Sequence, residues 1–131
     1  MANEAVCIEK PTIIKRITVA DGTAITKGTL LKLSGDYTGI ASSSTDVFGG
    51  ITLEEKTASD GVTEISVAYD GVWDLTCTGS GVTLGAIVVL SGANLIRNAV
   101  EADLVLGKVV GKAEEAGSAS EVIRVRVGAM G

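Results

Sequence analysis

The sequence predicts an all-β fold: a compact β-barrel or sandwich of about ten short strands, built from two similar units. The first observation is an internal repeat, because residues 25–35 and residues 82–92 both read as a Gly-led apolar strand that ends in Leu-Ser-Gly, 57 positions apart (82 − 25). The second is composition: 46% of the 131 residues are hydrophobic but only 3% are aromatic, so Val, Ile, Leu and Ala must build the core. The third is the presence of 17 glycines and one proline, which favours frequent tight turns.

The same spacing recurs along most of the chain. It also pairs Gly22 with Gly79, Gly50 with Gly107, Glu64 with Glu121 and Gly71 with Gly128. We therefore expect two units, about 17–73 and 74–130, that pack on each other within a single β domain spanning residues 12–131. Residues 1–11 precede this domain as an extended N-terminal arm, since Pro11 is a poor continuation of any regular element.

Within the first unit, alternation and turn residues place the strands. Residues 12–20 are rich in β-branched side chains and predict the first strand, and residues 31–33 and 37–41 predict a hairpin. Residues 47–53 predict a strand in which Gly49-Gly50 marks a bulge or a close approach of two backbones. Residues 65–69 alternate cleanly, and the Asp70-Gly71 step that follows resembles a hairpin turn.

The second unit repeats this order. Residues 86–90 predict a strand, Ser91-Gly92 breaks it, and Leu95-Ile96 predict the returning strand. Residues 99–104 are the candidate for a helical turn, and residues 104–110 resume strand character. The last strand, residues 122–127, alternates Ile and Val with two arginines, which is typical of a half-buried antiparallel strand.

Charge and length restrict the partners. The net charge of −5 argues against nucleic acid or an anionic membrane, since both select for a basic surface. The apolar run 86–90 is too short to span a bilayer, and the N-terminus does not resemble a signal peptide, so we expect a soluble, unexported protein. Cys7 and Cys77 are too few for a disulfide framework and fit no metal motif. Reduced structural thiols are favoured, although a bridge between them stays open.

The residue types that catalysis most often needs are scarce. Histidine, the commonest general base and metal ligand, is absent from the sequence. The adjacent carboxylates Glu54-Glu55 and Glu114-Glu115 fit solvated loops better than an acid–base pair, and turns explain Asp60-Gly61. We therefore expect no enzyme activity, no cofactor and no metal.

Three segments in a fixed order carry a resemblance. Residues 67–75 read Val-Ala-Tyr-Asp-Gly-Val-Trp-Asp-Leu, residues 82–90 read Val-Thr-Leu-Gly-Ala-Ile-Val-Val-Leu, and residues 122–128 read Val-Ile-Arg-Val-Arg-Val-Gly. Together they resemble the capsid cement, or head decoration, proteins of tailed phages. The resemblance covers roughly residues 17–128, with residues 106–109 in place of the family's Ile-Gly-Val-Ala-like strand. Thr76-Cys77 stand where members usually have a proline.

This resemblance implies a structural virion protein of a bacteriophage. Such a protein decorates the outer surface of an expanded capsid and stabilises it by bridging subunits of the major capsid protein. It would be made in the host cytoplasm and would assemble as a symmetric homo-oligomer, a trimer by family analogy or a dimer at a capsid two-fold axis.

The arm is the candidate contact with the capsid or with a neighbouring subunit, because an extended peptide can join subunits by strand addition. The residues assigned to this contact are Ala2, Asn3, Glu4, Val6, Ile8, Pro11 and Ile13. The alternative is a frayed tail.

The aromatic residues allow a second interpretation. Trp73 is either a core residue, which its apolar neighbours favour, or an interface anchor that faces a partner. A receptor- or glycan-binding β module on a phage head fibre is the alternative function, and it predicts a shallow surface patch around Tyr37, Tyr69 or Trp73.

Overall fold

The computed structural model describes residues 3–129, which contain 11 β-strands and one short helix. Their bounds are β1 Val6–Glu9, β2 Ile14–Thr18, β3 Leu30–Gly35, β4 Thr38–Ala41, β5 Phe48–Thr52, β6 Glu64–Ala68, β7 Gly71–Cys77, β8 Ile87–Leu90, β9 Leu95–Asn98, α1 Glu101–Val105, β10 Val109–Ala113 and β11 Val122–Val127. The all-β prediction is confirmed, and the helical turn expected near residues 99–104 is α1. None of the helical structure between residues 3 and 129 is long and apolar enough to cross a membrane.

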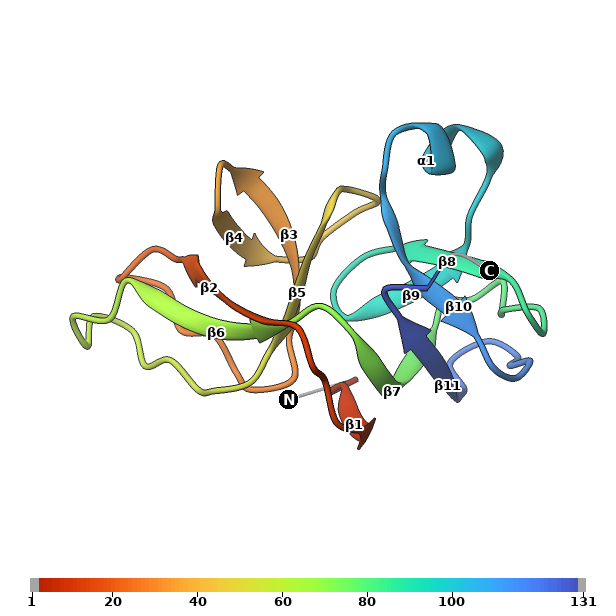
Figure 1. Ribbon diagram of the computed structural model, residues 1–131, viewed down its shortest axis with the longest axis horizontal. Helices are drawn as coiled ribbons and strands as arrows, with labels where there is room; N and C mark the ends of the chain where they lie inside the picture. Colours follow the sequence, from red (N-terminus) through yellow and green to blue (C-terminus); the bar gives the residue numbers. More distant parts are fainter. Residues whose placement is uncertain (1–2, 130–131) are drawn as a thin grey trace.

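Ten of the strands close into two five-stranded barrels, which lie side by side in Figure 1. The first barrel has the strand order β2-β4-β3-β5-β6. The second has the order β7-β11-β10-β8-β9 and is closed by pairing of β7 with β9. The remaining strand, β1, pairs with β7 on the outside of the second barrel.

Both barrels use the same pairing scheme. Each is closed by one parallel pair, β2–β4 in the first and β7–β9 in the second, and the other pairs are antiparallel. The spacing between equivalent strands varies, however: β4 and β9 begin 57 residues apart (38 and 95), whereas β5 and β10 begin 61 apart (48 and 109). The connection that contains α1 is longer than its counterpart in the first barrel, and this causes the difference.

The longer connection changes which glycines correspond. A constant offset pairs Gly50 with Gly107, and this pairing is wrong at the level of structure. The β3–β5 and β8–β10 registers both contain an extra residue, within Gly49-Gly50 in the first barrel and at Val110, next to Gly111, in the second. Gly50 therefore corresponds to Gly111, and the bulge expected at Gly49-Gly50 is present in both barrels.

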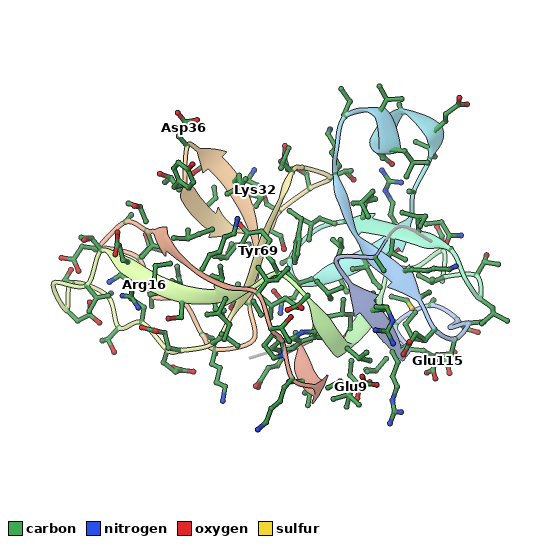
Figure 2. All side chains as sticks on the ribbon, in the orientation of Figure 1. Glu9, Arg16, Lys32, Asp36, Tyr69 and Glu115 are labelled. Carbon is green, nitrogen blue, oxygen red and sulfur yellow. The ribbon has the colours of Figure 1, made fainter. Side chains whose placement is uncertain are left out.

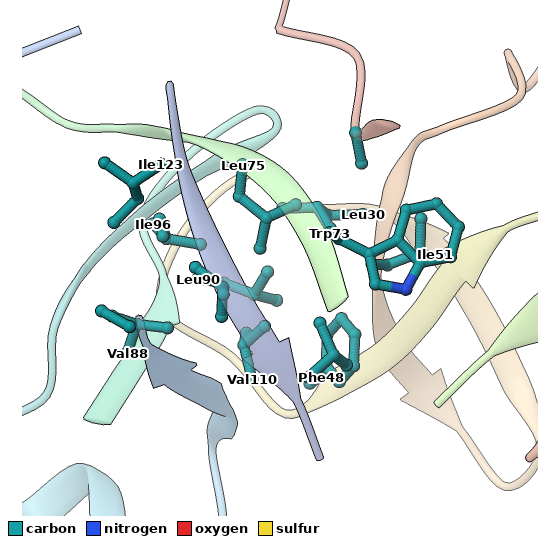
Figure 3. Close-up of a cluster of buried hydrophobic side chains, with 14 of the residues drawn as sticks. Leu30, Phe48, Ile51, Trp73, Leu75, Val88, Leu90, Ile96, Val110 and Ile123 are labelled. Atoms are coloured by element: carbon teal, nitrogen blue, oxygen red, sulfur yellow. The ribbon is translucent and has the colours of Figure 1, made fainter. Parts of the chain in front are cut away.

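Two apolar clusters fill the barrels. The interior of the first barrel contains Ile17, Val19, Ile25, Leu31, Ile65 and Val67. The larger cluster fills the second barrel and continues into the joint between the barrels, where Leu30, Phe48 and Ile51 of the first barrel lie among second-barrel side chains (Figure 3). On β11, Ile123, Val125 and Val127 are buried while the arginines between them are exposed, as the alternation predicted. Because one core crosses the joint, the barrels share their hydrophobic stabilisation.

The link between the barrels differs from the sequence-based expectation. The prediction of a hairpin turn at the Asp70-Gly71 step is wrong, since β6 belongs to the first barrel and β7 to the second. The step instead carries the chain across the joint. Gly71 has a φ of 97°, and a Cβ there would lie 2.7 Å from the carbonyl oxygen of Glu9, so glycine lets the N-terminal segment pass close to the link.

Asn94 connects the second barrel to the rest of the chain. Its side chain is 4% exposed, and its Nδ2 donates hydrogen bonds to the carbonyl oxygens of Gly28 at 2.8 Å and Asn3 at 3.0 Å. Its Oδ1 accepts a hydrogen bond from the Leu30 N–H at 2.9 Å, and its own N–H donates to Ser42 Oγ at 3.1 Å. This turn residue of the second barrel therefore holds both the first barrel and the N-terminal segment.

Replacement of Asn94 by glycine tests this joint. Glycine keeps the backbone conformation, with φ of 56°, but removes three side-chain hydrogen bonds, including the one that the buried Leu30 N–H donates. We expect the free energy of unfolding, measured in urea, to fall by about 1–3 kcal/mol. Tyr37→Gly is the matched control, because Tyr37 occupies the corresponding turn with φ of 52° and an exposed ring. Equal losses in the two variants would contradict the role of the amide.

Gly111 provides a test of the bulge. A Cβ at this position would lie 2.2 Å from the carbonyl oxygen of Arg126, so the adjacent strands would have to move apart. We expect Gly111→Ala to lower the free energy of unfolding by about 1–3 kcal/mol. Gly79→Ala is the control, since a Cβ on Gly79 would have no other atom within 4 Å. A Gly111 variant as stable as the control would show that the strands have room there.

Candidate protein-docking site

The N-terminal segment lies on the second barrel as an added strand. β1 runs antiparallel to β7, with Val6 opposite Asp74 and Cys7 opposite Trp73. Upstream of β1, Ala5 is buried, and its N–H donates a hydrogen bond to the Gly28 carbonyl oxygen at 3.0 Å. The segment is thus held along its own chain by backbone pairing and by Asn94, so the described part of it is docked.

Downstream of β1, the carboxylate of Asp70 holds the chain as it enters the first barrel. Its Oδ1 accepts hydrogen bonds from the N–H groups of Thr12 at 2.7 Å and Ile13 at 2.8 Å, and its Oδ2 accepts one from the Thr12 hydroxyl. These hydrogen bonds, that from Ile13 first, hold the pKa of Asp70 below its usual value. Asp70 therefore fixes the inter-barrel link and the start of β2 together.

The docked segment exposes apolar side chains. Val6 is 50% exposed and Ile14 is 56% exposed, and Ile8 and Ile13 are exposed as well. We call these four residues the arm surface: Val6, Ile8, Ile13 and Ile14. Within residues 3–129, β1 pairs with β7 alone, so its other edge presents unpaired backbone groups next to this surface. An apolar strip beside a free strand edge can accept another protein by strand addition.

The other residues assigned to the arm lie around this strip. Asn3 and Glu4 are exposed, and Pro11 is half-buried between β1 and β2. Ala2 lies outside the described residues. Glu9, labelled in Figure 2, ends β1 on the exposed face. The residues proposed from sequence are therefore brought together along one stretch of backbone, apart from Ala2, whose position is not described.

Trp73 lies in the core. It is 3% exposed, packs in the cluster that crosses the joint, and donates a hydrogen bond from Nε1 to the Asp70 carbonyl oxygen at 3.0 Å. Its ring therefore offers almost no surface to a partner within a single copy of the chain.

A groove lies on the first barrel, between β2 and the turn that joins β3 to β4. It encloses about 570 Å³ and is lined by Lys15, Arg16, Ile17, Leu33, Gly35, Asp36, Tyr37 and Tyr69. Figure 2 labels Arg16, Asp36 and Tyr69 around this part of the first barrel. The Tyr37 ring is 79% exposed, whereas Tyr69 is half-buried, and burial raises the pKa of its phenol. The groove thus contains two of the three rings that the glycan-binding alternative singled out.

The two cations of the groove differ in their partners. The Arg16 guanidinium lies 3.5 Å from a Glu64 carboxylate oxygen and 3.9 Å from one of Glu54, so its charge is compensated. The Lys15 ammonium lies 5.2 Å from the centroid of the Tyr69 ring, which is the geometry of a cation–π contact. Lys15 makes no ion pair with any residue between 3 and 129. The groove therefore contains a cation that an acidic ligand group could neutralise.

Other polar residues that the sequence singled out have structural partners. Glu54 accepts a hydrogen bond from the Ser66 N–H at 3.2 Å, and Glu55 accepts one from the Lys27 N–H at 3.2 Å, so these adjacent carboxylates point to different neighbours. Over the described part of the chain, no three His, Cys, Asp or Glu residues group as metal ligands. Cys7 is exposed, Cys77 is buried, and both are free thiols.

Lys56 is a buried residue that sequence reasoning missed. Its side chain is 0% exposed, and its ammonium pairs with Asp60 at 2.9 Å and Asp21 at 3.2 Å. It also donates hydrogen bonds to the carbonyl oxygens of Asp21 and Thr57. A lysine between turn residues gives no local signal of burial, because the carboxylates that neutralise it lie in two separate turns.

No protein-family model matches the sequence, and no curated protein matches it.

The Asp70 carboxylate predicts a dependence of stability on pH. Because its pKa is depressed in the folded state, it stabilises the protein above the unfolded pKa of about 3.9, and this contribution is lost as pH falls through the folded pKa. We expect Asp70→Asn to reduce the free energy of unfolding at pH 7 by roughly 1 kcal/mol.

The difference between Asp70→Asn and the wild type should shrink as the pH of urea unfolding falls from 7 to about 3. Asp36→Asn is the control, because Asp36 lies in the exposed β3–β4 turn. A loss that is equally large at both pH values would mean that the negative charge of Asp70 contributes nothing.

Proposed function

We propose that the protein decorates the outside of an expanded phage capsid and stabilises it by bridging subunits of the major capsid protein, without enzyme activity. The segments that resemble head decoration proteins support this proposal. They fall mainly on β7, β8 and β11, three strands of the second barrel. The resemblance therefore concerns the strands of one folded unit in their order along the chain.

The observation that carries the proposal is the arm surface beside the free edge of β1. A decoration protein must attach to a shell it does not help to build, and strand addition needs only a free edge and neighbouring apolar side chains. Val6 and Ile8 supply exposed apolar side chains on β1 itself. Repetition of such a weak contact over a whole shell produces avidity without any single strong site.

The connection that contains α1 supports association with further copies of the chain. α1 projects from the second barrel in Figure 1, and Val100, Leu104, Val105 and Leu106 are exposed around it. This connection is nevertheless ordered by Asp103, which accepts a hydrogen bond from the Val100 N–H at 3.0 Å and pairs with Arg97 at 3.2 Å. An ordered, exposed apolar surface favours a subunit contact, in a trimer or in a dimer on a capsid two-fold axis.

A receptor- or glycan-binding module on a head fibre is the second candidate. The groove favours it, because Tyr37 and Tyr69 could stack on a sugar ring while Lys15 and Asp36 bind hydroxyl groups. Saccharide titration monitored by tyrosine fluorescence would separate this candidate from decoration of a capsid.

Cosedimentation with mature heads that lack decoration tests the proposal. We expect saturable binding by the wild type, and roughly tenfold weaker binding by the double variant Val6→Thr, Ile8→Thr. Threonine keeps the β-branched shape that suits a strand while reducing the apolar contact. A chain that starts at Thr12 should lose binding as well.

Val122→Thr serves as the matched control, since Val122 is 57% exposed but lies on β11, outside the arm surface and the α1 connection. Undiminished binding by the double variant would move the capsid contact away from β1. No binding by the wild type would overturn the decoration proposal for that head.

A further inference from the structure

The groove follows an open edge of β2. Along its other edge, β2 pairs with β6 over its whole length, from Ile14 opposite Ala68 to Thr18 opposite Glu64. On the edge toward the groove, Thr18 pairs with Thr38 of β4, and no other β2 residue has a strand partner within residues 3–129. The odd-numbered residues of this segment make their backbone hydrogen bonds toward β6. The Ile13 carbonyl oxygen accepts one from the Tyr69 N–H, and the Val19 N–H donates one to the Thr63 carbonyl oxygen. The backbone groups of Ile14 and Arg16 therefore point into the groove, because alternate residues of a strand bond to opposite sides.

In the second barrel, a strand occupies the corresponding edge. In the first barrel Ile17 of β2 lies opposite Ile65 of β6, and in the second Leu75 of β7 lies opposite Ile123 of β11; all four side chains are buried. Matching these two pairs aligns β2 with β7 at a spacing of 58 residues (75 − 17). Ile14, Lys15 and Arg16 thus correspond to Val72, Trp73 and Asp74, the residues that pair with β1. The site that β1 fills on the second barrel is open on the first.

The turn beside each edge shows the same contrast. Asn94 and Tyr37 occupy the same position in the β8–β9 and β3–β4 turns, and both have positive φ, 56° and 52°. Asn94 is buried and bonds to the Asn3 carbonyl oxygen, just before β1. Tyr37 holds a conformation that is unfavourable for a bulky residue, yet its ring is exposed at the rim of the groove. Such strain at a surface position is typical of a residue that contacts a ligand.

The geometry points to the groove as a docking site for one extended strand of the capsid coat protein, paired antiparallel to β2 as β1 is to β7. This inference rests on the proposed function for the identity of the partner. The docked strand bonds to the backbone of Ile14 and Arg16 and packs apolar side chains on Leu33 and Tyr37. In the docked strand, the residue that lies opposite Lys15 has its side chain on the same face as that of Lys15. This residue is acidic, because Lys15 has no ion-pair partner in residues 3–129 that would already neutralise it.

A peptide tests whether the groove accepts a strand at all. The probe is a synthetic peptide with the sequence of residues 4–10, which contains the strand that fills the equivalent edge of the second barrel. In that strand Cys7 lies opposite Trp73, the residue that corresponds to Lys15. Peptides that carry Cys7→Glu, Cys7→Ser or Cys7→Lys are titrated into the intact protein, and amide NMR signals are followed. We expect shifts and slowed hydrogen exchange at Ile14 and Arg16, with the Glu peptide binding about two- to fivefold more tightly than the Ser peptide.

The Lys peptide should bind more weakly than the Ser peptide, and added salt should reduce the differences. Shifts confined to Val72–Asp74 would show that the peptide only replaces β1 at its own site, and this would overturn the inference. Saccharide binding at Tyr37 and Tyr69 without any peptide binding would also overturn it, in favour of a glycan ligand.

Two variants examine the groove from the protein side. Ile14→Pro removes the N–H that faces the groove, while its control Ile14→Val keeps it. Tyr37→Gly removes the ring and relieves the positive φ, so its fold should be at least as stable as the wild type. We expect Ile14→Pro and Tyr37→Gly each to bind the Glu peptide at least about tenfold more weakly, whereas Ile14→Val binds normally.

Cosedimentation of the same variants with undecorated heads separates this inference from the proposed function. Wild-type binding that both Ile14→Pro and Tyr37→Gly weaken supports the coat strand. Wild-type binding that Tyr37→Gly leaves unchanged overturns the coat strand but keeps the decoration function. If the wild type fails to bind heads, the coat protein is excluded as the partner even where the peptide binds.

Discussion

The hydrogen bonds of the Asn94 side chain are the constraint on which the rest of the structure depends. One buried amide satisfies the Gly28 carbonyl oxygen and the Leu30 N–H at the start of β3, and also the Asn3 carbonyl oxygen of the N-terminal segment. Gly28 and Leu30 are buried, and a buried polar group without a partner is costly. Asparagine suits this position because it tolerates the left-handed conformation of the turn and carries both a donor and an acceptor.

This constraint acts on one side of a duplicated structure. Two barrels with the same strand pairing would be expected to treat their exposed edges alike, but only the β7 edge is covered by β1. The two turn residues differ in the same way: the short amide of Asn94 bonds to the N-terminal segment, whereas the side chain of Tyr37 is exposed. Within the described residues, one of the two equivalent edges is thus covered by β1 and contributes to the fold, and the other is uncovered.

The sequence contained enough information for the fold class but not for its assembly. Alternation in residues 122–127 and the glycines at 49 and 50 reveal which face is buried and where a strand bulges, because these depend on neighbouring residues. Strand pairing depends on residues far apart in the chain, so Asp70-Gly71 gave the signal of a turn although it links two barrels. The burial of Asn94 and Lys56 could not be read from neighbouring residues alone, since Asn94 bonds to Gly28 and Leu30 in the other barrel, and Lys56 pairs with Asp21, 35 positions away, as well as with nearby Asp60. The arm residues could be proposed from their place around Pro11 at the N-terminal end of the sequence, but the open edge beside the groove could be found only by comparing the two barrels.

An open β edge is a liability, since it can pair with any exposed strand and lead to aggregation. The β2 edge carries two charged side chains, Lys15 and Arg16, where its counterpart on β7 has Trp73 and Asp74. Charges on an edge oppose indiscriminate pairing, and the net charge of −5 makes separate copies repel one another. The same lysine that discourages a random strand favours one with a matching acidic residue, because pairing then neutralises it. Protection of the free protein and selection of its partner can therefore reside in the same side chain.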